Sequence, residues 1–439
     1  MSNAWTSPRC ARRTSSSSGS TTLKILLWHG YLLGGTGSNV YSRALAREWS
    51  RAGHEVVVLC QESHSERFDL GGARVVRPRL PGPLPVFVLD HYEDLEARYL
   101  QDFTREEREA YVEANAAAVR AELPADLLLV NHVLPGGAVG LASGMPFAVK
   151  AHGSELEFSL RGNEELAARA REALDRADAV YAGSEHIRRV LEEILGPGAY
   201  EARVRIAPPG VDVDELRPEL RDEALAGLVE ESRQDTPNPG RARERDPDPG
   251  NAERLADFLA GDDPTVVYVG KLSREKGADL LLDAVRDVGA RTVMVGFGPL
   301  RDELEAAVAG RPVLFTGPLE HRHLRHLWAL ADVSVTPSVF PEAFGMVAAE
   351  AAACGSPPLV ARHSGLAEIA AGIEAEYPPE RRELVSFEPG SAGALAAKLG
   401  ALLALPSAER RSLGEAARRA VVARWSWARV AALLLSRDG

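Results

Sequence analysis

The residues best suited to chemistry are two acids eight positions apart, Glu342 and Glu350, in the stretch PEAFGMVAAEAAACG (341–355). Glu342 lies in a loop flanked by Pro and Gly, whereas Glu350 lies in an alanine-rich run that should be helical. We expect Glu342 at or before the helix N-terminus and Glu350 about two turns into the helix. At that separation the carboxylates cannot share a proton, so they should have different roles. Because a helix N-terminus favours an anion, Glu342 beside an anionic ligand must contact something else, such as sugar hydroxyls.

A basic cluster, KLSREKG (271–277), follows a predicted strand and opens a predicted helix. Lys271, Arg274 and Lys276 would crowd the carboxyl end of that strand, which indicates an anion site. The alternative is ordinary solvated surface. No metal-chelating acidic pair accompanies the cluster, so the sequence predicts no metal site. If a diphosphate leaves here, fixed cations must replace Mg²⁺ in stabilising it.

Two further features follow predicted strands. Gly34, Gly35 and neighbouring glycines form a loop before a predicted helix, where a phosphate could approach the backbone, although a plain tight turn is the alternative. Val40 stands where a dinucleotide fingerprint needs its third glycine, which disfavours a nicotinamide-dependent oxidoreductase. His152 comes directly after an apolar strand, as a catalytic or a structural histidine.

The elements that must position these residues alternate between strand and helix. Such βα repeats predict a parallel sheet, and two doubly wound α/β domains in series would form a cleft at the carboxyl ends of their strands. Strands are expected at 23–28, 54–60, from 126, from 146, from 178, 265–269, 291–295, 313–315 and 332–336. The expected domains begin with a disordered tail 1–20 and an N-terminal Rossmann-like domain 21–211. A flexible polar insertion or linker 217–263 follows, then a C-terminal Rossmann-like domain 264–420. The last is a C-terminal helix 421–439, with packing back onto the first domain as one arrangement.

Composition limits the function class. The chain has 439 residues, 45% hydrophobic and 26% charged, with a net charge of −12, which argues against a nucleic-acid-binding protein. No apolar run is long enough to cross a bilayer. Three scattered cysteines without metal spacing predict a reduced cytoplasmic protein. The lack of an evident basic amphipathic helix favours a soluble substrate over a lipid, while peripheral membrane contact stays open.

Taken in order from Leu23 to about Leu435, these pieces resemble the retaining GT-B glycosyltransferases of the group-1 (GT4) family. The most specific signature is E-x-F-G-x-x-x-x-E, present as Glu342, Phe344, Gly345 and Glu350. The supporting pieces are Gly34-Gly35, His152-Gly153, Ser184, Pro209-Gly210-Val211-Asp212, Gly270-Lys271, Lys276-Gly277 and Gly298-Pro299-Leu300.

The resemblance implies a role for each matched residue. Lys271 and Lys276 look like the pair that grips the donor diphosphate, Glu350 like the acid on the ribose, and Glu342 like the acid on the sugar. The donor is also expected to contact Gly34 and Gly35 from the other domain, the backbone of Phe344, Gly345, Met346 and Val347, His152 beside the sugar, and Leu319 at the base. The implied reaction is metal-independent hexosyl transfer with retention, from a nucleotide diphosphate sugar as co-substrate to an acceptor hydroxyl. UDP or GDP is the expected nucleotide, no other cofactor is implied, and the acceptor is a small molecule or glycan.

Four positions depart from the family pattern: Lys271 where Arg is usual, Phe297 where Asp is common, Pro358 at a strand start, and Ser364 in place of a glycine pair. None removes a charged anchor, but they leave the donor sugar open.

The first domain should bind the acceptor, and its candidate contacts are Tyr31, His91, Tyr92, Asn131 and His132, each of which could instead be ordinary surface or packing. Two alternatives to a transferase are a GT-B nucleotide-sugar epimerase and a catalytically silent nucleotide-sugar binding protein.

Overall fold

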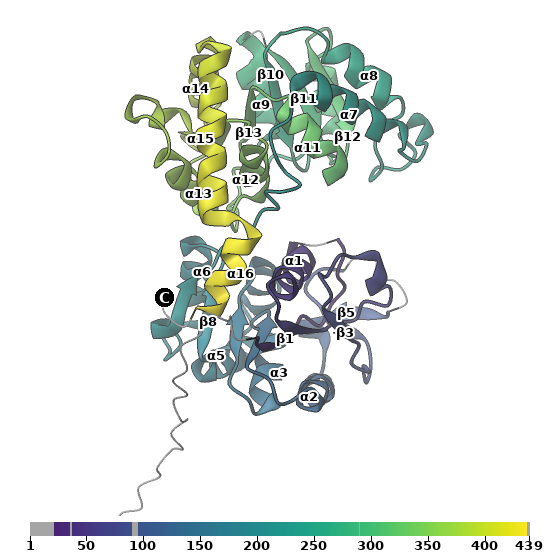
Figure 1. Ribbon diagram of the computed structural model, residues 1–439, viewed down its shortest axis with the longest axis vertical. Coiled ribbons are helices and arrows are strands. Elements are labelled where there is room, and N and C mark those ends of the chain that lie inside the picture. The colour runs from purple at the N-terminus through teal and green to yellow at the C-terminus, as the bar shows by residue number, and fades with distance from the viewer. Residues whose placement is uncertain (1–21, 36, 90–94, 289, 437–439) are drawn as a thin grey trace, which may run out of the picture.

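The computed structural model describes residues 22–35, 37–89, 95–288 and 290–436. Within these residues, two α/β domains lie end to end (Figure 1). The N-terminal domain holds a seven-stranded parallel sheet in the order β3-β2-β1-β6-β7-β8-β9. Its strands are β1 (Lys24–Trp28), β2 (Glu55–Leu59), β3 (Arg74–Val76), β6 (Leu127–Asn131), β7 (Ala148–Lys150), β8 (Ala179–Ala182) and β9 (Val204–Ile206). A small parallel pair, β4 (Leu84–Val86) and β5 (Ala97–Tyr99), lies beside it.

The C-terminal domain repeats this plan. The part of it that the structure describes forms a six-stranded parallel sheet in the order β12-β11-β10-β13-β14-β15. Its strands are β10 (Thr265–Val269), β11 (Arg291–Val295), β12 (Val313–Gly317), β13 (Val333–Thr336), β14 (Pro358–Ala361) and β15 (Ser386–Phe387). The predicted strands 265–269 and 291–295 have the predicted bounds, and the doubly wound α/β class is confirmed.

Helices cover both sheets. The first domain has α1 (Gly37–Arg51), α2 (Arg105–Ala121), α3 (Gly136–Ser143), α4 (Gly153–Glu155), α5 (Glu164–Arg176) and α6 (Glu185–Leu195). The second has α7 (Arg221–Arg233), α8 (Asn251–Phe258), α9 (Ala278–Ala284), α10 (Arg301–Ala307), α11 (His321–Ala329), α12 (Met346–Ala353), α13 (Ser364–Glu374), α14 (Ala392–Ala404) and α15 (Ser407–Trp425), and α16 (Trp427–Leu435) follows. Because helices lie on both faces, central strands are apolar without alternation: Ile25, Leu26 and Leu27 of β1 are all fully buried.

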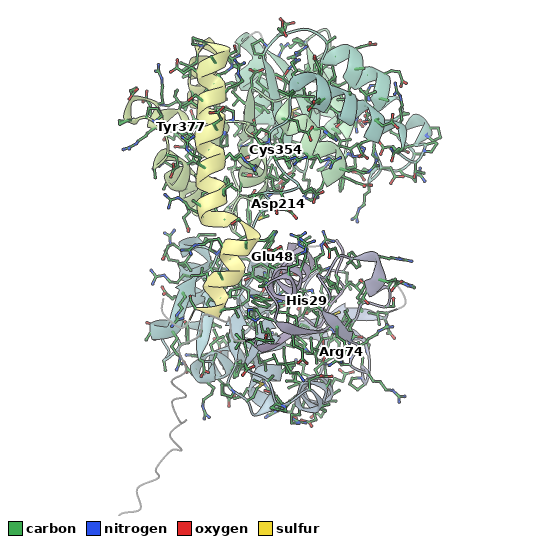
Figure 2. The ribbon with its side chains drawn as sticks, viewed as in Figure 1. His29, Glu48, Arg74, Asp214, Cys354 and Tyr377 are labelled. Atoms are coloured by element: carbon green, nitrogen blue, oxygen red, sulfur yellow. The ribbon has the colours of Figure 1, made fainter. Side chains whose placement is uncertain are left out.

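The chain crosses between the domains at two adjacent points. The Val211 N–H donates to the Trp425 carbonyl at 2.6 Å, and the Trp427 N–H donates to the Val211 carbonyl at 3.2 Å. Asp214 lies beside this crossing, between the domains (Figure 2). Beyond it, α16 packs against α1 of the first domain, where the Trp49 indole N–H donates to the Ala431 carbonyl at 3.0 Å. The paired crossing segments therefore fix one side of the space between the sheets.

The prediction of a flexible linker over 217–263 is wrong, because this segment contains α7 and α8. Apolar residues spaced four apart, Ala224 with Leu228 and Leu255 with Leu259, are all fully buried. The polar stretch between the helices is also hydrogen-bonded to the sheet, because the Asp248 N–H donates to the Thr316 carbonyl of the edge strand β12 at 2.8 Å. The Pro-, Gly- and Arg-rich composition of the stretch between them hid two helices that each bury a few apolar residues.

Three other predictions concern the ends and the environment of the chain. The tail 1–20 lies outside the described residues, as do His91 and Tyr92. No helix in the described part of the chain is long and apolar enough to span a membrane. Cys60 and Cys354 are buried free thiols in different domains.

Candidate functional site

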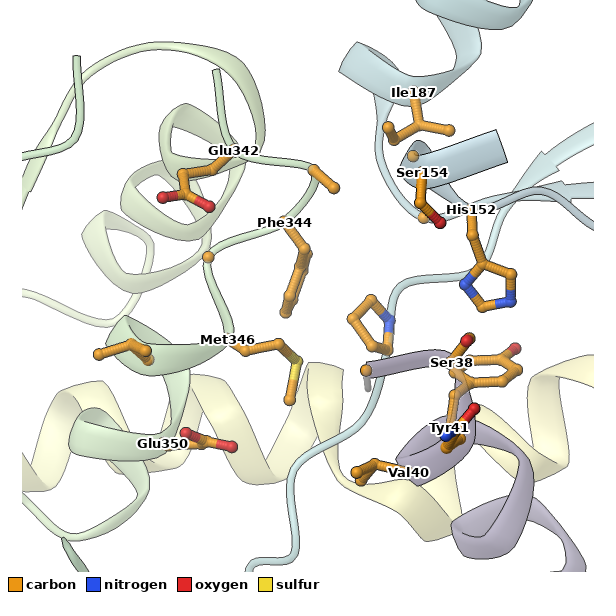
Figure 3. A pocket seen from close by; sticks show the side chains of 18 of the residues that line it. Ser38, Val40, Tyr41, His152, Ser154, Ile187, Glu342, Phe344, Met346 and Glu350 are labelled. Atoms are coloured by element: carbon orange, nitrogen blue, oxygen red, sulfur yellow. The ribbon is translucent and has the colours of Figure 1, made fainter. Parts of the chain in front are cut away.

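A cavity of about 680 Å³ lies between the carboxyl ends of the two sheets and is lined by both domains. Its C-terminal wall carries Glu342, Phe344, Met346 and Glu350, which face Ser38, Val40, Tyr41 and His152 of its N-terminal wall (Figure 3). Of the predicted site residues, eleven line this cavity: Tyr31, Gly35, His132, His152, Lys276, Glu342, Phe344, Gly345, Met346, Val347 and Glu350. The structure thus brings together most of the predicted donor and acceptor residues.

Glu342 is held by several groups on the C-terminal wall. The Lys276 ammonium and the Ser338 hydroxyl each donate to Glu342 Oε1 at 2.6 Å. The backbone N–H of Glu342 donates to Ser364 Oγ at 2.8 Å, so the serine at this unusual position supports the loop. The Glu342 side chain is 21% exposed and the Lys276 side chain 36%, and both line the cavity.

The tight turn after Glu342 requires glycine. Gly345 has φ 109°, and a Cβ there would lie 2.6 Å from a leucine side chain. The helix α12 begins at the next residue, Met346, and its first residues line the cavity, so that the free N–H groups of a helix start favour an anion there. Glu350 is the fifth residue of α12, a little over one turn from its start and not the two turns expected. The helix begins later than predicted because the backbone at Gly345 is left-handed.

Glu350 is paired with a residue that sequence reasoning did not select. His321, the first residue of α11, contacts Glu350 Oε1 through its Nε2 at 3.2 Å. The hydrogen bond with Glu350 raises the pKa of His321, although burial acts in the opposite direction. The Glu350 side chain is only 12% exposed, so His321 leaves a limited part of this carboxylate open to a ligand.

His152 on the N-terminal wall is oriented by a chain of hydrogen bonds. Its Nε2 lies 2.9 Å from Asn131 Oδ1, the Asn131 amide donates to Ser42 Oγ at 2.9 Å, and Ser42 Oγ donates to the Ser38 carbonyl at 2.8 Å. The Ser42 hydroxyl donates its proton to a carbonyl, so it must accept the hydrogen bond from the Asn131 N–H₂ group. Asn131 Oδ1 therefore faces His152 and accepts its Nε2 proton. Burial, followed by the charges of His132 and Lys150, lowers the pKa of His152 well below its ordinary value. Neutral His152 therefore carries its lone pair on Nδ1.

The same wall holds two buried groups with spare hydrogen-bonding capacity. Lys150 is 1% exposed, and its ammonium donates to the Ala207 carbonyl at 2.6 Å. Burial lowers the pKa of Lys150 to about 7. Tyr41 is also 1% exposed, and its hydroxyl has no hydrogen-bond partner among the described residues. Both residues line the cavity.

Of the predicted residues that the structure describes, four do not line the cavity. Lys271 is exposed at the end of β10, where its charge acts on the neighbouring Glu275. Gly34 and Leu319 are half-buried and also lie outside the lining. The prediction of Asn131 as an acceptor contact is corrected, because the residue is fully buried. Its Nδ2 donates to Ser42 and its Oδ1 accepts from His152.

Sequence reasoning missed the residues that support the site: Ser338, His321, Lys150 and Glu155. Ser338 and Lys150 each follow or end a strand at the carboxyl edge of a sheet, and this position was a usable signal. Glu155 follows His152 by three residues, a spacing that places an acid in the first turn of a helix. In the described part of the chain, no group of three or more His, Cys, Asp or Glu side chains is arranged to hold a metal ion.

Comparison with solved structures defines the fold class. The chain resembles HepE of Anabaena, solved with UDP and glucose, with a TM-score of 0.64 and 16% identity over 94% of this chain and 98% of that one. It also resembles sucrose-phosphate synthase of Thermosynechococcus elongatus, with a TM-score of 0.61 and 23% identity over 94% of this chain and 97% of that one. These likenesses show the GT-B fold, two Rossmann-like domains facing each other across a cleft.

Sequence comparison then gives the family. Residues 35–215 match the model "Glycosyltransferase Family 4", and residues 252–420 match "Glycosyl transferases group 1". The chain belongs to this family, the group-1 (GT4) glycosyltransferases. It is 37% identical over 180 residues to the GDP-mannose-dependent alpha-(1-6)-phosphatidylinositol dimannoside mannosyltransferase of Mycobacterium tuberculosis. That match covers 40% of this chain and 43% of the relative, so it spans less than half of that protein's length.

Proposed function

We propose that the protein moves a hexosyl unit from a nucleotide diphosphate sugar to an acceptor hydroxyl, with retention at the anomeric carbon and without a metal ion. Family membership supports the reaction class. The observation that carries the donor site is the convergence of Lys276, Glu342 and Glu350 around the N-terminus of α12 in one cavity. UDP and GDP are the expected nucleotides, and GDP-mannose is the first donor to test, because the name of a related mannosyltransferase specifies it.

The donor diphosphate would lie between Lys276 and the first N–H groups of α12. Lys276 already neutralises Glu342 at 2.6 Å, so a bound diphosphate would compete for the same ammonium group. A fixed ammonium and a helix N-terminus stabilise the negative charge that develops on the leaving diphosphate, the task that Mg²⁺ performs in other enzymes. Lys271, which lies outside the cavity lining, would contribute less.

Glu342 and Glu350 would hold the two ends of the donor. With Lys276 engaged by phosphate, Glu342 can accept hydrogen bonds from sugar hydroxyls while Ser338 keeps its orientation. Glu350 would accept the ribose hydroxyls on the part of its carboxylate that His321 leaves open. This division explains why the acids are too far apart to act as a pair.

His152 would lie beside the transferred sugar on the N-terminal wall, with its ring held by Asn131. A neutral imidazole adds no positive charge beside an anomeric carbon that becomes electron-poor in the transition state. Among the described residues that line the cavity, the carboxylates are Glu342 and Glu350, and both are assigned to the donor and not to a glycosidase-like nucleophile. We therefore infer front-face attack, in which the leaving phosphate oxygen takes the proton of the acceptor hydroxyl.

The N-terminal wall would bind the acceptor, a small molecule or glycan. Closure of the two domains on the donor would exclude water, whose attack would waste the donor as free sugar. The hydroxyl of Ser184 in the first domain already donates to the Ala343 carbonyl of the second at 2.6 Å. A cytoplasmic location is part of the proposal, and the buried free thiols of Cys60 and Cys354 fit a reducing compartment.

The test is turnover of GDP-mannose, UDP-glucose and ADP-glucose with and without a mixture of sugar and cyclitol acceptors, in EDTA. We expect nucleotide release that depends on an acceptor, and a product whose anomeric configuration by proton NMR matches the donor. An inverted product would refute retention. A silent binding protein would show no turnover, and an epimerase would convert the donor without any acceptor.

A further inference from the structure

His132 occupies a backbone conformation that needs an explanation. It follows β6 at the carboxyl edge of the sheet and has φ 69°, in the left-handed region that residues other than glycine rarely adopt. Its side chain is 1% exposed and lines the cavity. Such strain persists where the surrounding structure enforces it, and it is frequent at ligand-binding positions.

A buried carboxylate fixes the His132 ring. Glu155 is fully buried, and its Oε2 lies 3.1 Å from His132 Nδ1. The other oxygen, Oε1, accepts the backbone N–H of His152 at 2.7 Å and that of Val133 at 3.4 Å. A carboxylate with these donors can only accept from His132, so Nδ1 carries the ring proton. In the neutral imidazole, Nε2 then carries the lone pair.

The lone pair has no partner in the described part of the chain. His132 Nε2 is a buried nitrogen without a hydrogen bond to any described residue. A buried polar atom left unpaired costs free energy, about 1–3 kcal/mol in typical cases. Since the ring lines the cavity, a ligand hydroxyl is the natural partner.

The surroundings of His132 suit a ring-shaped ligand. The Phe87 ring centroid lies 4.9 Å from that of His132, and the Tyr31 centroid lies 5.2 Å away in an edge-on arrangement. Both aromatic side chains line the cavity, together with the half-exposed Val88. Aromatic side chains beside a hydrogen-bond acceptor match a cyclic polyol, which has apolar C–H faces and a rim of hydroxyls.

We propose that His132 Nε2 accepts a hydrogen bond from a non-reacting hydroxyl of a cyclic polyol acceptor, and that Glu155 is the positioning residue that fixes this tautomer. This inference rests on the proposed transferase function and specifies its acceptor. His132 orients the acceptor ring against Phe87 and Tyr31 so that a different hydroxyl faces the anomeric carbon. No proton leaves the acceptor through His132.

The first test reads the tautomer by ¹⁵N NMR of the histidine rings at pH 8, with His132 assigned from the spectrum of His132→Asn. Asn is chosen because it tolerates a left-handed backbone. We expect a protonated Nδ1 and an unprotonated Nε2 in the wild type. In Glu155→Gln the amide can donate to Nδ1, so the ring proton should move to Nε2. A wild-type ring that is protonated on Nε2 would overturn the proposal, whatever the enzymatic activity.

The second test uses methyl α-D-mannopyranoside and myo-inositol as probes. With GDP present, we expect saturation-transfer NMR to detect binding of at least one of these two probes to the wild type. The same measurement should show that this binding is lost in His132→Asn. Where a probe is turned over, kcat/KM for transfer should fall about ten- to hundredfold in His132→Asn. His64→Gln, an exposed histidine outside the cavity, is the control and should match the wild type.

The outcomes separate the two proposals. Binding of neither ring to the wild type, or equal transfer by wild type and His132→Asn, would refute the acceptor contact while leaving a transferase intact. Absence of all donor turnover would instead refute the proposed function. The ¹⁵N NMR measurement would still show whether Glu155 fixes the tautomer of His132. If Glu155→Gln fails to fold, His132→Asn alone decides the question.

Discussion

The C-terminal wall of the cavity is built from charged side chains on short loops and a helix start, whereas the N-terminal wall is built largely from neutral groups held by buried partners. Lys276 pairs directly with Glu342, and Glu350 pairs separately with His321. In contrast, buried residues orient both histidines of the N-terminal wall: Asn131 binds the His152 ring, and Glu155 binds the His132 ring. A charged donor needs countercharge, and a polyol acceptor needs correctly directed lone pairs.

The largest expected effect is on the C-terminal wall, at Glu342. Glu342→Ala should lower kcat for transfer by about 10²–10³, because a contact made to the sugar in the transition state is lost. Nucleotide binding should survive, as measured by calorimetric titration of GDP. Glu342→Gln, which keeps the acceptor atom for Ser338, separates loss of charge from loss of shape. Normal turnover in Glu342→Ala would remove the main assignment.

The next comparison pairs two lysines of one loop. Lys276→Ala should weaken donor binding about ten- to hundredfold, since it removes a charged hydrogen-bond donor from the cavity. Lys271→Ala should have a clearly smaller effect, because Lys271 lies outside the lining. Titrating both variants with UDP-glucose and GDP-mannose checks this order. The reverse order would show that the family-like role belongs to Lys271.

On the N-terminal wall, Asn131→Ala should act through His152. The ring loses the partner that fixes its tautomer, so transfer should fall about tenfold while the affinity for free nucleotide stays unchanged. Because Asn131 is fully buried, a loss of about 1–3 kcal/mol in stability is also expected. Measuring kcat and GDP affinity side by side checks the split; weaker nucleotide binding would contradict the division between walls.

The smallest effect concerns His321. Its pKa is raised, chiefly by the hydrogen bond with Glu350. A raised folded-state pKa contributes stability below the unfolded value near 6.5, and this stability is lost as pH rises through the folded value. His321→Asn should therefore lower Tm more at pH 6 than at pH 8.5. An equal difference at both pH values would argue against the ion pair.

The two walls also differ in how far the sequence could predict them. Glu342, Gly345 and Glu350 lie within nine residues, so their spacing along one loop and helix places them together. His132 and Glu155 lie on separate βα connections and meet only because β6 and β7 are neighbours in the sheet. Asparagine is usually a surface residue, and the sequence does not show that Asn131 is buried. Its structural role becomes visible only in the fold, where it is fully buried and hydrogen-bonded to His152.

The segment 217–263 was mispredicted for a related reason. Its composition resembles that of a disordered linker, yet buried apolar residues pack α7 against α8 and α11. Average composition reports the many exposed residues of such a segment, whereas the docking free energy comes from the few buried ones.

Donor titration of three proteins tests the division between the walls most directly. Wild type, Lys276→Ala and His132→Asn would be titrated with GDP-mannose and UDP-glucose by calorimetry under identical conditions. We predict that the wild type binds at least one donor, that His132→Asn binds it with the same affinity, and that Lys276→Ala binds it about ten- to hundredfold more weakly. Failure of the wild type to bind either donor, or equal weakening in both variants, would contradict the assignment of the donor to the C-terminal wall.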